Sequence, residues 1–468
     1  MIDLVEERSV FRVDDPFRGG VVAEVPLLDA ARAHSAVERA AAAQRSFARL
    51  PLEERMALCR GFVAALERRA EPVAHGISRQ MGKPLAQARS EVATCLDRAR
   101  TLIELAPEAL APVRLQEREG YRRRITHEPV GVVLVIAAWN YPLLVPVGAV
   151  VAAVLAGNAV LIKHAPRTPL CAEHFASAFC EAGAPFDLVA PLHADHEVVA
   201  QVMTHPAIGY VAFTGSVRGG REVYEAVAKR RFVEVGLELG GKDAAYVAAD
   251  ADLTRAVESL VDGAMYNAGQ SCCAVERIYV HRSLYDPFVE QAVRLARGYV
   301  LGDPLDETTT MGPMAQQQAP AFLEAQVEEA RAAGGQVLCG GERVQVDGRG
   351  RFFAPTVVAD APQRCSLMQE ESFGPVVGIA PVDDDDEAVR RINDSRYGLT
   401  ASIWTADPER AERIGARVDV GTVYMNRCDY LDPELPWSAW KESGRGVSLS
   451  RYGFLPVTRR KSWHFRLG

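Results

Sequence analysis

The residue best suited to covalent chemistry is a cysteine in a polar, glycine-containing loop. Cys272 lies in the stretch Tyr266–Ala274, between a predicted helix and a predicted strand. The thiolate is the reactive form of cysteine, and backbone N–H groups in such a loop can lower a thiol pKa without a partner base. On its own, the pair Cys272 and Cys273 is more typical of small buried core residues. The loop therefore indicates a candidate nucleophile that needs support from other residues.

Two further polar side chains stand where they could assist a cysteine. Glu238 is a lone carboxylate among apolar residues and glycines in Val235–Lys242, and burial would raise its pKa toward that of a general base. Its alternative role is an ion pair with Lys242. Asn140 follows a predicted strand in Trp139–Pro142, at the carboxyl end where parallel strands place ligands, and its amide can stabilise an oxyanion.

A glycine-containing turn between a strand and a helix could bind a phosphate. The stretch Phe213–Gly220 contains Gly215, Ser216 and Gly220, and glycine lets the backbone approach an anion at a helix N-terminus. It has neither the Gly-x-Gly-x-x-Gly spacing nor the Lys-Ser or Lys-Thr of a Walker A loop, because Arg221 follows Gly220. A simple turn is the commoner role of such a stretch, so a nucleotide site is one of two readings here.

Alternating strands and helices must position these residues. Strands and helices alternate from Gly131 to Val235, and a second alternating region follows Gly240–Gly241, which predicts two doubly wound α/β units. The N-terminal hundred residues are expected to be mostly helix, because apolar residues recur at helical spacing between Ser35 and Arg69. Arg122–His127 and Val457–Phe465 are expected to be lone strands that seek partners.

The composition excludes several classes of protein. The chain has 468 residues, 48% of them hydrophobic, and a net charge of -8, so we expect a large globular protein that binds no nucleic acid. Nine scattered cysteines and an N-terminus without a basic leader predict a reduced, cytoplasmic protein. Prolines and a Gly-Asn pair divide the uncharged run between Glu128 and Lys163 into strand, helix and strand, so no membrane span is expected.

Together these stretches resemble the aldehyde dehydrogenase superfamily over nearly the whole chain. The family's Trp-Asn-Phe-Pro, Phe-Thr-Gly-Ser, Glu-Leu-Gly-Gly-Lys and Gly-Gln-x-Cys motifs appear in order at Trp139–Pro142, Phe213–Ser216, Glu238–Lys242 and Gly269–Cys272. Its Glu-x-Phe-Gly-Pro, late Asn and Lys-x-Ser-Gly motifs appear at Glu371–Pro375, Asn426 and Lys441–Gly444.

The resemblance implies an α/β fold with three parts. Residues 1–115 and 129–240 would form a Rossmann-type NAD(P)-binding domain, and residues 241–440 a second α/β domain for catalysis. Residues 116–128 and 441–468 would form a small β extension that builds a homodimer or homotetramer.

The resemblance also implies a mechanism and a set of site residues. Cys272 attacks an aldehyde, Asn140 stabilises the oxyanion, and Glu238 activates water to hydrolyse the resulting thioester. The hydride acceptor is NAD by first expectation, with NADP as the alternative, and no metal is expected. The cofactor residues that the family implies are Trp139, Lys163, Gly215, Ser216, Gly220, Leu239, Glu371 and Phe373. The substrate tunnel is expected to contain Tyr141, Tyr266, Tyr430 and Leu431.

Two departures from the family pattern bear on specificity. Many members have a Glu three residues after Lys163 that binds both ribose hydroxyls, but this chain has Pro166 there, so a 2′-phosphate meets less repulsion and His164 or Arg167 is a candidate contact for it. In the second departure, Asn426–Pro433, the aromatic and apolar side chains predict an apolar aliphatic or aromatic aldehyde. The alternative is a semialdehyde such as succinate semialdehyde, with Arg427 as the fork for its carboxylate.

Three other activities are weighed against this reading. A CoA-acylating dehydrogenase would use Cys272 as well but typically lacks the activating Glu, so Glu238 argues against it. A cysteine peptidase or transglutaminase would need a His beside Cys272, and none of the ten histidines lies near it in the sequence. A catalytically silent relative usually loses the Cys or the Glu, and this chain retains both.

Overall fold

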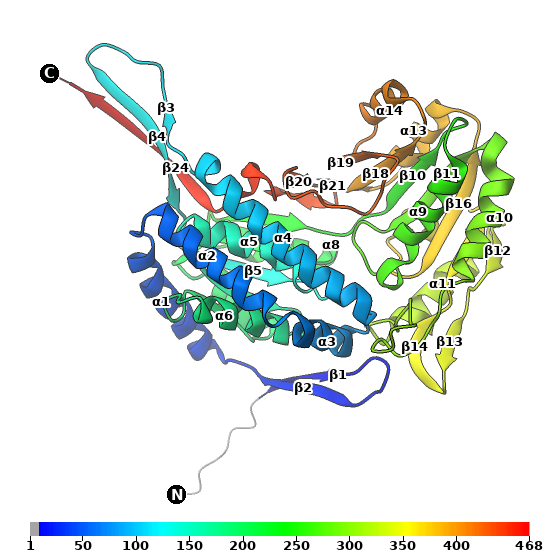
Figure 1. Ribbon diagram of the computed structural model, residues 1–468, viewed down its shortest axis with the longest axis horizontal. Helices are drawn as coiled ribbons and strands as arrows, with labels where there is room; N and C mark the ends of the chain where they lie inside the picture. The colour runs from blue at the N-terminus through cyan, green and yellow to red at the C-terminus, as the bar shows by residue number, and fades with distance from the viewer. Residues whose placement is uncertain (1–8, 468) are drawn as a thin grey trace, which may run out of the picture.

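The computed structural model describes residues 9–467 and contains two large sheets with helices packed around them (Figure 1). The first sheet has the order β22-β9-β8-β5-β6-β7, and all its neighbours are parallel except β22, which runs antiparallel to β9. Its strands are β5 (Val132–Ala137), β6 (Ala159–His164), β7 (Val189–Pro191), β8 (Ile208–Thr214), β9 (Glu234–Glu238) and β22 (Gly444–Arg445). The expected doubly wound arrangement is present.

Among the described residues, eight helices belong to this half of the chain. They are α1 (Ala30–Phe47), α2 (Leu52–Glu67), α3 (Ala70–Met81), α4 (Leu85–Ala109), α5 (Leu144–Leu155), α6 (Leu170–Glu181), α7 (His196–Met203) and α8 (Val217–Ala228). Helix α5 is apolar on nearly every face because it is buried against β5, β6 and α4. The uncharged run is thus strand, helix and strand, and within residues 9–467 no helix has the length and apolar character needed to cross a bilayer.

The second sheet has the order β12-β15-β16-β11-β10-β18-β19. It is parallel apart from the edge strand β12, which runs antiparallel to β15. Its strands are β10 (Asp243–Val247), β11 (Val275–His281), β12 (Gln336–Cys339), β15 (Thr356–Ala359), β16 (Val376–Val382), β18 (Thr400–Trp404) and β19 (Thr422–Met425). Its helices are α9 (Leu253–Met265), α10 (Tyr285–Ala296), α11 (Ala319–Ala332), α12 (Ser366–Gln369), α13 (Asp385–Asn393) and α14 (Pro408–Gly415).

The two expected lone strands pair with each other. In β4 (Tyr121–Pro129) and β24 (Thr458–Arg466), nine antiparallel residue pairs run from Tyr121↔Arg466 to Pro129↔Thr458, and β3 (Val113–Arg114) adds to the other edge of β4. This sheet projects from the body of the molecule beside the C-terminus (Figure 1). The preceding C-terminal residues Gly444–Arg445 pair with β9 in the first sheet instead.

Several short strand pairs complete the structure. One of them is the N-terminal hairpin β1–β2, in a region that the sequence predicted to be mainly helix. The prediction missed it because its two strands are short and their side chains do not alternate regularly between buried and exposed. The pairs are β1 (Val10–Asp14) with β2 (Val21–Pro26), β13 (Arg343–Val346) with β14 (Arg349–Phe353), β17 (Tyr397–Gly398) with β21 (Trp440–Lys441), and β20 (Trp437–Ser438) with β23 (Val447–Ser448).

The topology gathers three predicted site residues at one edge of the first sheet. Strands β5, β8 and β9 are neighbours, and their carboxyl ends lead to Asn140, Gly215 and Glu238. Cys272 comes from the other half of the chain, in the loop between α9 and β11. The site is therefore assembled from both α/β units.

Candidate active site

The loop that carries Cys272 is held in an uncommon backbone conformation. Asn267, Ala268 and Gly269 have φ values of 54°, 54° and 67°, so the chain reverses direction directly after α9. A Cβ at Gly269 would lie 2.1 Å from the carbonyl oxygen of Gly374, so only glycine fits this position. Steric constraint thus explains why the first position of the Gly-Gln-x-Cys motif is glycine.

The same loop is bonded to the segment that carries Asn140. The Asn267 side chain donates through Nδ2 to the carbonyl oxygens of Asn140 and Gln270, both at 3.1 Å. The Gln270 side chain donates to the Asn267 carbonyl at 3.0 Å and accepts from the Ala315 N–H at 2.9 Å. These buried bonds fix the relative position of the Cys272 and Asn140 backbones across the two halves of the chain.

Cys272 and its neighbour Cys273 have different surroundings. Cys272 is half-buried and lines the cavity described below. Cys273 is buried, and its Sγ donates to Oδ1 of Asp429 at 2.9 Å. A hydrogen bond with Cys272 and burial raise the pKa of Cys273 well above its usual range, and burial raises the pKa of Asp429 to about 6. Both cysteines line the cavity, but Cys273 is buried and its thiol is bonded to Asp429, whereas Cys272 is the more exposed of the two.

Glu238 has the setting of a general base. Its Oε1 accepts a hydrogen bond from the Ser448 hydroxyl at 3.0 Å, and its buried Oε2 has no partner within residues 9–467. Burial raises the pKa of Glu238 to about 7. The alternative ion pair with Lys242 does not form, because Lys242 is bonded to Glu276 and to Ser372. The carboxyl group thus has a free oxygen and a near-neutral pKa.

A cavity of about 350 Å³ joins the predicted catalytic and tunnel residues. It is lined by Cys272, Glu238 and the buried residue Asn140. The described structure gives the Asn140 side-chain amide no protein partner, so it can donate to an oxygen in the cavity. The other predicted residues that line this cavity are Tyr141, Leu239, Tyr266, Tyr430 and Leu431.

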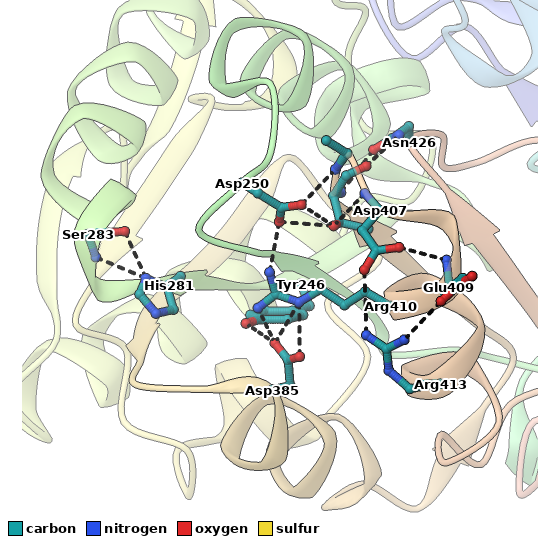
Figure 2. A network of polar contacts seen from close by, with 12 residues as sticks. Tyr246, Asp250, His281, Ser283, Asp385, Asp407, Glu409, Arg410, Arg413 and Asn426 are labelled. Atoms are coloured by element: carbon teal, nitrogen blue, oxygen red, sulfur yellow. Dashed lines mark hydrogen bonds and ion pairs between the residues drawn. The ribbon is translucent and has the colours of Figure 1, made fainter.

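Asn426, at the family's late Asn position, shapes this cavity indirectly. Its amide donates to the Thr405 carbonyl at 2.9 Å and accepts from the Thr405 N–H at 3.1 Å. The Thr405 hydroxyl in turn donates to Asp250, which is paired with Arg410 at 2.8 Å. Figure 2 shows Asn426 at one end of this network. Asn426 therefore anchors the start of the loop 427–433, in which residues 428–431 line the cavity.

Two cofactor residues predicted from the resemblance lie at a second cavity of about 480 Å³, which contains Ser216 and Glu371. Ser216 caps α8, accepting from the Gly219 N–H at 3.2 Å, so the N–H groups and positive end of this helix face the cavity. Oε1 of Glu371 accepts from the Gly241 N–H at 3.1 Å, and burial raises the pKa of Glu371 to about 8. A helix N-terminus for a pyrophosphate and a carboxyl group for ribose hydroxyls fit a dinucleotide.

The remaining predicted cofactor residues are not among those that line this second cavity, and Leu239 lines the first one. The rings of Trp139 and Phe373 meet edge to face, with centroids 5.5 Å apart. A Cβ at Gly220 would lie 2.6 Å from Leu239, and one at Gly215 would lie 2.7 Å from the Phe213 ring, so both glycines permit close packing beside α8. Lys163 ends up buried near the end of β6, where burial lowers the pKa of its amine to about 8.

Neither candidate contact for a 2′-phosphate is free to make it. The His164 side chain is buried, bonded to the Pro142 carbonyl and the Thr168 hydroxyl, and burial lowers its pKa to about 4. Arg167 donates to the Gln80 carbonyl at 2.6 Å and forms an ion pair with Asp14. The prediction that one of them contacts a 2′-phosphate is wrong in this structure, because the fold uses both side chains internally.

Arg427 is likewise not placed to recognise a substrate carboxylate. Its exposed guanidinium carbon lies 3.3 Å from the centroid of the Tyr430 ring, and Arg427 does not line the cavity. The cavity contains a different arginine, Arg98 of α4, and Ser448 supports Glu238. Sequence reasoning missed both, although a charged residue on the apolar face of α4 was a usable signal for Arg98.

Comparison with known proteins identifies the family to which the chain belongs. The sequence matches the model of the aldehyde dehydrogenase family over residues 4–463. The chain belongs to the aldehyde dehydrogenase family. It is thus an NAD(P)-dependent enzyme that oxidises aldehydes, and the predicted recognition and fold class are confirmed.

Two curated relatives and one solved structure illustrate the similarity. The chain is 36% identical to succinate-semialdehyde dehydrogenase [NADP(+)] of Deinococcus radiodurans, covering 96% of this chain and 94% of the relative. It is 35% identical to the succinate semialdehyde dehydrogenase [NAD(P)+] Sad of Escherichia coli, with 94% of each chain covered. A crystal structure of an NAD-dependent aldehyde dehydrogenase from Sinorhizobium meliloti is similar to this structure with a TM-score of 0.95. The two sequences are 33% identical, and the match covers 98% of this chain and 92% of that chain.

Proposed function

We propose that Cys272, Asn140 and Glu238 oxidise the aldehyde through a covalent thioester. The Cys272 thiolate adds to the aldehyde carbon, and the Asn140 amide with the Cys272 N–H stabilises the resulting oxyanion. When bound, NAD(P)+ supplies the acceptor for the hydride that leaves this carbon. Glu238 then takes a proton from water, which attacks the thioester and releases the carboxylic acid and the Cys272 thiol. The observation that carries this proposal is the shared cavity, into which all three side chains open.

For the substrate, we propose a small aldehyde that also bears a carboxylate. The named activities of the Deinococcus and Escherichia relatives support this class. The expectation of an apolar or aromatic aldehyde rested on Tyr430 and Leu431, but polar side chains such as Gln87 and Ser90 line the same cavity. The preference for the semialdehyde alternative therefore rests on the named activities of these relatives, and the polar side chains within a mostly apolar lining are compatible with it.

A panel of matched aldehydes tests this substrate class. We expect kcat/KM for 4-oxobutanoate to exceed that for butanal and for benzaldehyde by about tenfold or more, since each 1.4 kcal/mol of added transition-state binding gives a factor of ten. Initial rates of NAD(P)H formation at limiting aldehyde measure these values. A preference for butanal or benzaldehyde would contradict the proposed class and restore the apolar one.

For the cofactor, we propose that both dinucleotides are accepted, with NAD the first choice. Pro166 carries no charge to repel a 2′-phosphate, and neither His164 nor Arg167 is free to attract one. We expect kcat/KM for NAD and NADP to lie within about tenfold of each other, a difference of about 1.4 kcal/mol. Pro166→Glu should lower use of NADP selectively, because it adds a charge that repels the phosphate. A bias above about 100-fold toward NADP in the wild type would refute this proposal.

We also propose that the sheet of β3, β4 and β24 pairs with a second copy in a homodimer or homotetramer. Its support is the exposure of Val113 and Phe465 on this projecting sheet. Likewise, we propose residues 1–115 with 129–240 as the cofactor domain and 241–440 as the catalytic domain. Sedimentation equilibrium measures the number of copies.

A further inference from the structure

The substrate cavity contains a buried arginine that the mechanism does not use. Arg98 lies near the middle of α4 on its apolar face, one turn from the buried Cys95 and Leu102, and is 5% exposed. A guanidinium keeps its charge at any physiological pH, and burying that charge is costly unless an anion or several acceptors compensate it. A buried arginine beside the reacting groups therefore needs a partner.

The described residues provide acceptors for only some of the N–H groups of Arg98. Its Nη1 donates to the Leu144 carbonyl at the start of α5, at 2.9 Å. Its Nε is buried without a partner, and no carboxylate within residues 9–467 forms an ion pair with this arginine. Of the five N–H donors of a guanidinium, only one thus has an acceptor among the described residues.

Three acidic side chains around the cavity, Glu91, Asp429 and Glu238, are already engaged. Glu91, two helical turns before Arg98, forms a buried ion pair with Lys83 and accepts from the Leu143 N–H at 2.8 Å. Asp429 accepts from Cys273, and Glu238 accepts from Ser448. None of these carboxylates forms an ion pair with the guanidinium, although the charge of Arg98 acts to lower the pKa of Glu238. Within residues 9–467 the guanidinium thus has no directly bonded counter-ion.

We propose that Arg98 binds the carboxylate of the substrate and so determines the enzyme's specificity for aldehydes with a terminal carboxylate. This inference rests on the proposed function and names the residue that recognises the substrate carboxylate. The planar fork of Arg98 can donate two hydrogen bonds to a carboxylate. Arg98 lines the same cavity as Cys272, so a short semialdehyde anchored at one end presents its other end to the thiol. The negative charge of the substrate carboxylate then pairs with the guanidinium of Arg98.

The position of Arg98 also explains why the cavity would disfavour uncharged aldehydes. An aldehyde of the same length without a carboxylate leaves the buried guanidinium unpaired, and a site built for a charged group rejects ligands that lack it. Ser90 and Thr94, two turns and one turn earlier on α4, also line the cavity and extend its polar side toward Arg98. The selectivity is thus assigned to α4 and not to the loop 427–433.

Variants of Arg98, assayed in the full-length enzyme, test the inference. Arg98→Gln should lower kcat/KM for 4-oxobutanoate by about 100-fold or more, mainly through KM, because it removes one partner of a buried charge pair. The kcat/KM for butanal and for the methyl ester of 4-oxobutanoate should stay the same or rise. Arg98→Lys should show a smaller loss of about tenfold, since the charge remains but the fork does not.

Arg100→Gln is the matched control. Arg100 lies on the exposed face of the same helix, paired with Glu67 and Asp97, and its replacement should leave the preference between 4-oxobutanoate and butanal unchanged. If Arg98→Gln does not fold, as judged by its thermal melting, Arg98→Lys decides instead. Succinate should also inhibit the wild type more strongly than butyrate, and this difference should shrink in Arg98→Lys.

The outcomes separate the two proposals. If the wild type prefers 4-oxobutanoate and folded Arg98 variants keep that preference and the succinate inhibition, the assignment to Arg98 is overturned while the substrate class stands. If the wild type shows no preference for the carboxylated aldehyde, the substrate class itself is wrong, and the assignment to Arg98 is overturned with it. A loss of preference confined to the Arg98 variants supports both.

Discussion

Replacing Cys272 by Ala is expected to lower aldehyde-dependent formation of NAD(P)H by about 10⁴-fold or more, because removal of a covalent nucleophile eliminates the route through the thioester. The fold should persist, since Cys272 is half-buried and lies at the cavity surface. Steady-state rates at saturating aldehyde and cofactor measure the loss, and the thermal melting temperature checks that the variant is folded.

Cys273→Ala is the matched comparison for this experiment. The two cysteines are adjacent, but the Cys273 thiol is buried and donates to Asp429, so its removal should leave at least about a tenth of the wild-type rate, the order expected for loss of one buried hydrogen bond. A Cys272→Ala variant that stays active while Cys273→Ala is inactive would reverse the assignment of the nucleophile.

Replacing Glu238 by Gln is expected to have the second largest effect, lowering kcat by about 10²- to 10⁴-fold, the usual contribution of a general base. The amide occupies the same space and can still contact Ser448 but cannot take a proton from water. Acylation should continue, so rapid mixing should give a burst of about one NAD(P)H per active site followed by a slow phase. A variant with wild-type turnover and no burst would contradict the role of Glu238 in hydrolysis.

The pH dependence provides an independent check on Glu238. Burial raises the pKa of this group to about 7. Below that pH the carboxyl is protonated and cannot act as a base, and above it the carboxylate can, so hydrolysis of the thioester should rise as pH increases through about 7. The Gln variant should lack this rise in the slow phase, since it has no titrating group at this position.

The local pattern in the sequence was sufficient to predict the parallel strands of the first sheet and strands β10 and β11 of the second, but not β12, β15, β16, β18 and β19. The apolar run from Val132 to Ile162 contains two strands around a helix because its prolines and its Gly157–Asn158 pair set the boundaries at the expected places. The brief β1–β2 hairpin was not predicted, since two short strands without a regular alternation carry little periodic signal. The pairing of Gly444–Arg445 with Leu237–Glu238 could not be predicted from the local pattern either, because these two segments lie far apart in the chain.

The candidate site likewise has features that the local sequence predicts and features that only the tertiary structure reveals. Motifs that need a particular residue type were found from the sequence, as with Gly269, where a Cβ would meet the Gly374 carbonyl. Partners supplied by tertiary structure were not: Ser448 reaches Glu238 from β23, and Arg98 reaches the cavity from α4. His164 was misjudged for the same reason, because only the fold reveals its bonds to Pro142 and Thr168.

The covalent step at Cys272 is tested most directly by mass spectrometry of the Glu238→Gln variant in a Cys273→Ala background. The enzyme is mixed with 4-oxobutanoate and NAD(P), quenched in acid within the slow phase, digested and sequenced by fragmentation. We predict an acyl group on Cys272 in most of the enzyme, lost on treatment with hydroxylamine as expected for a thioester. A quenched enzyme that has formed NAD(P)H but carries no acyl group on Cys272 would contradict the thioester mechanism.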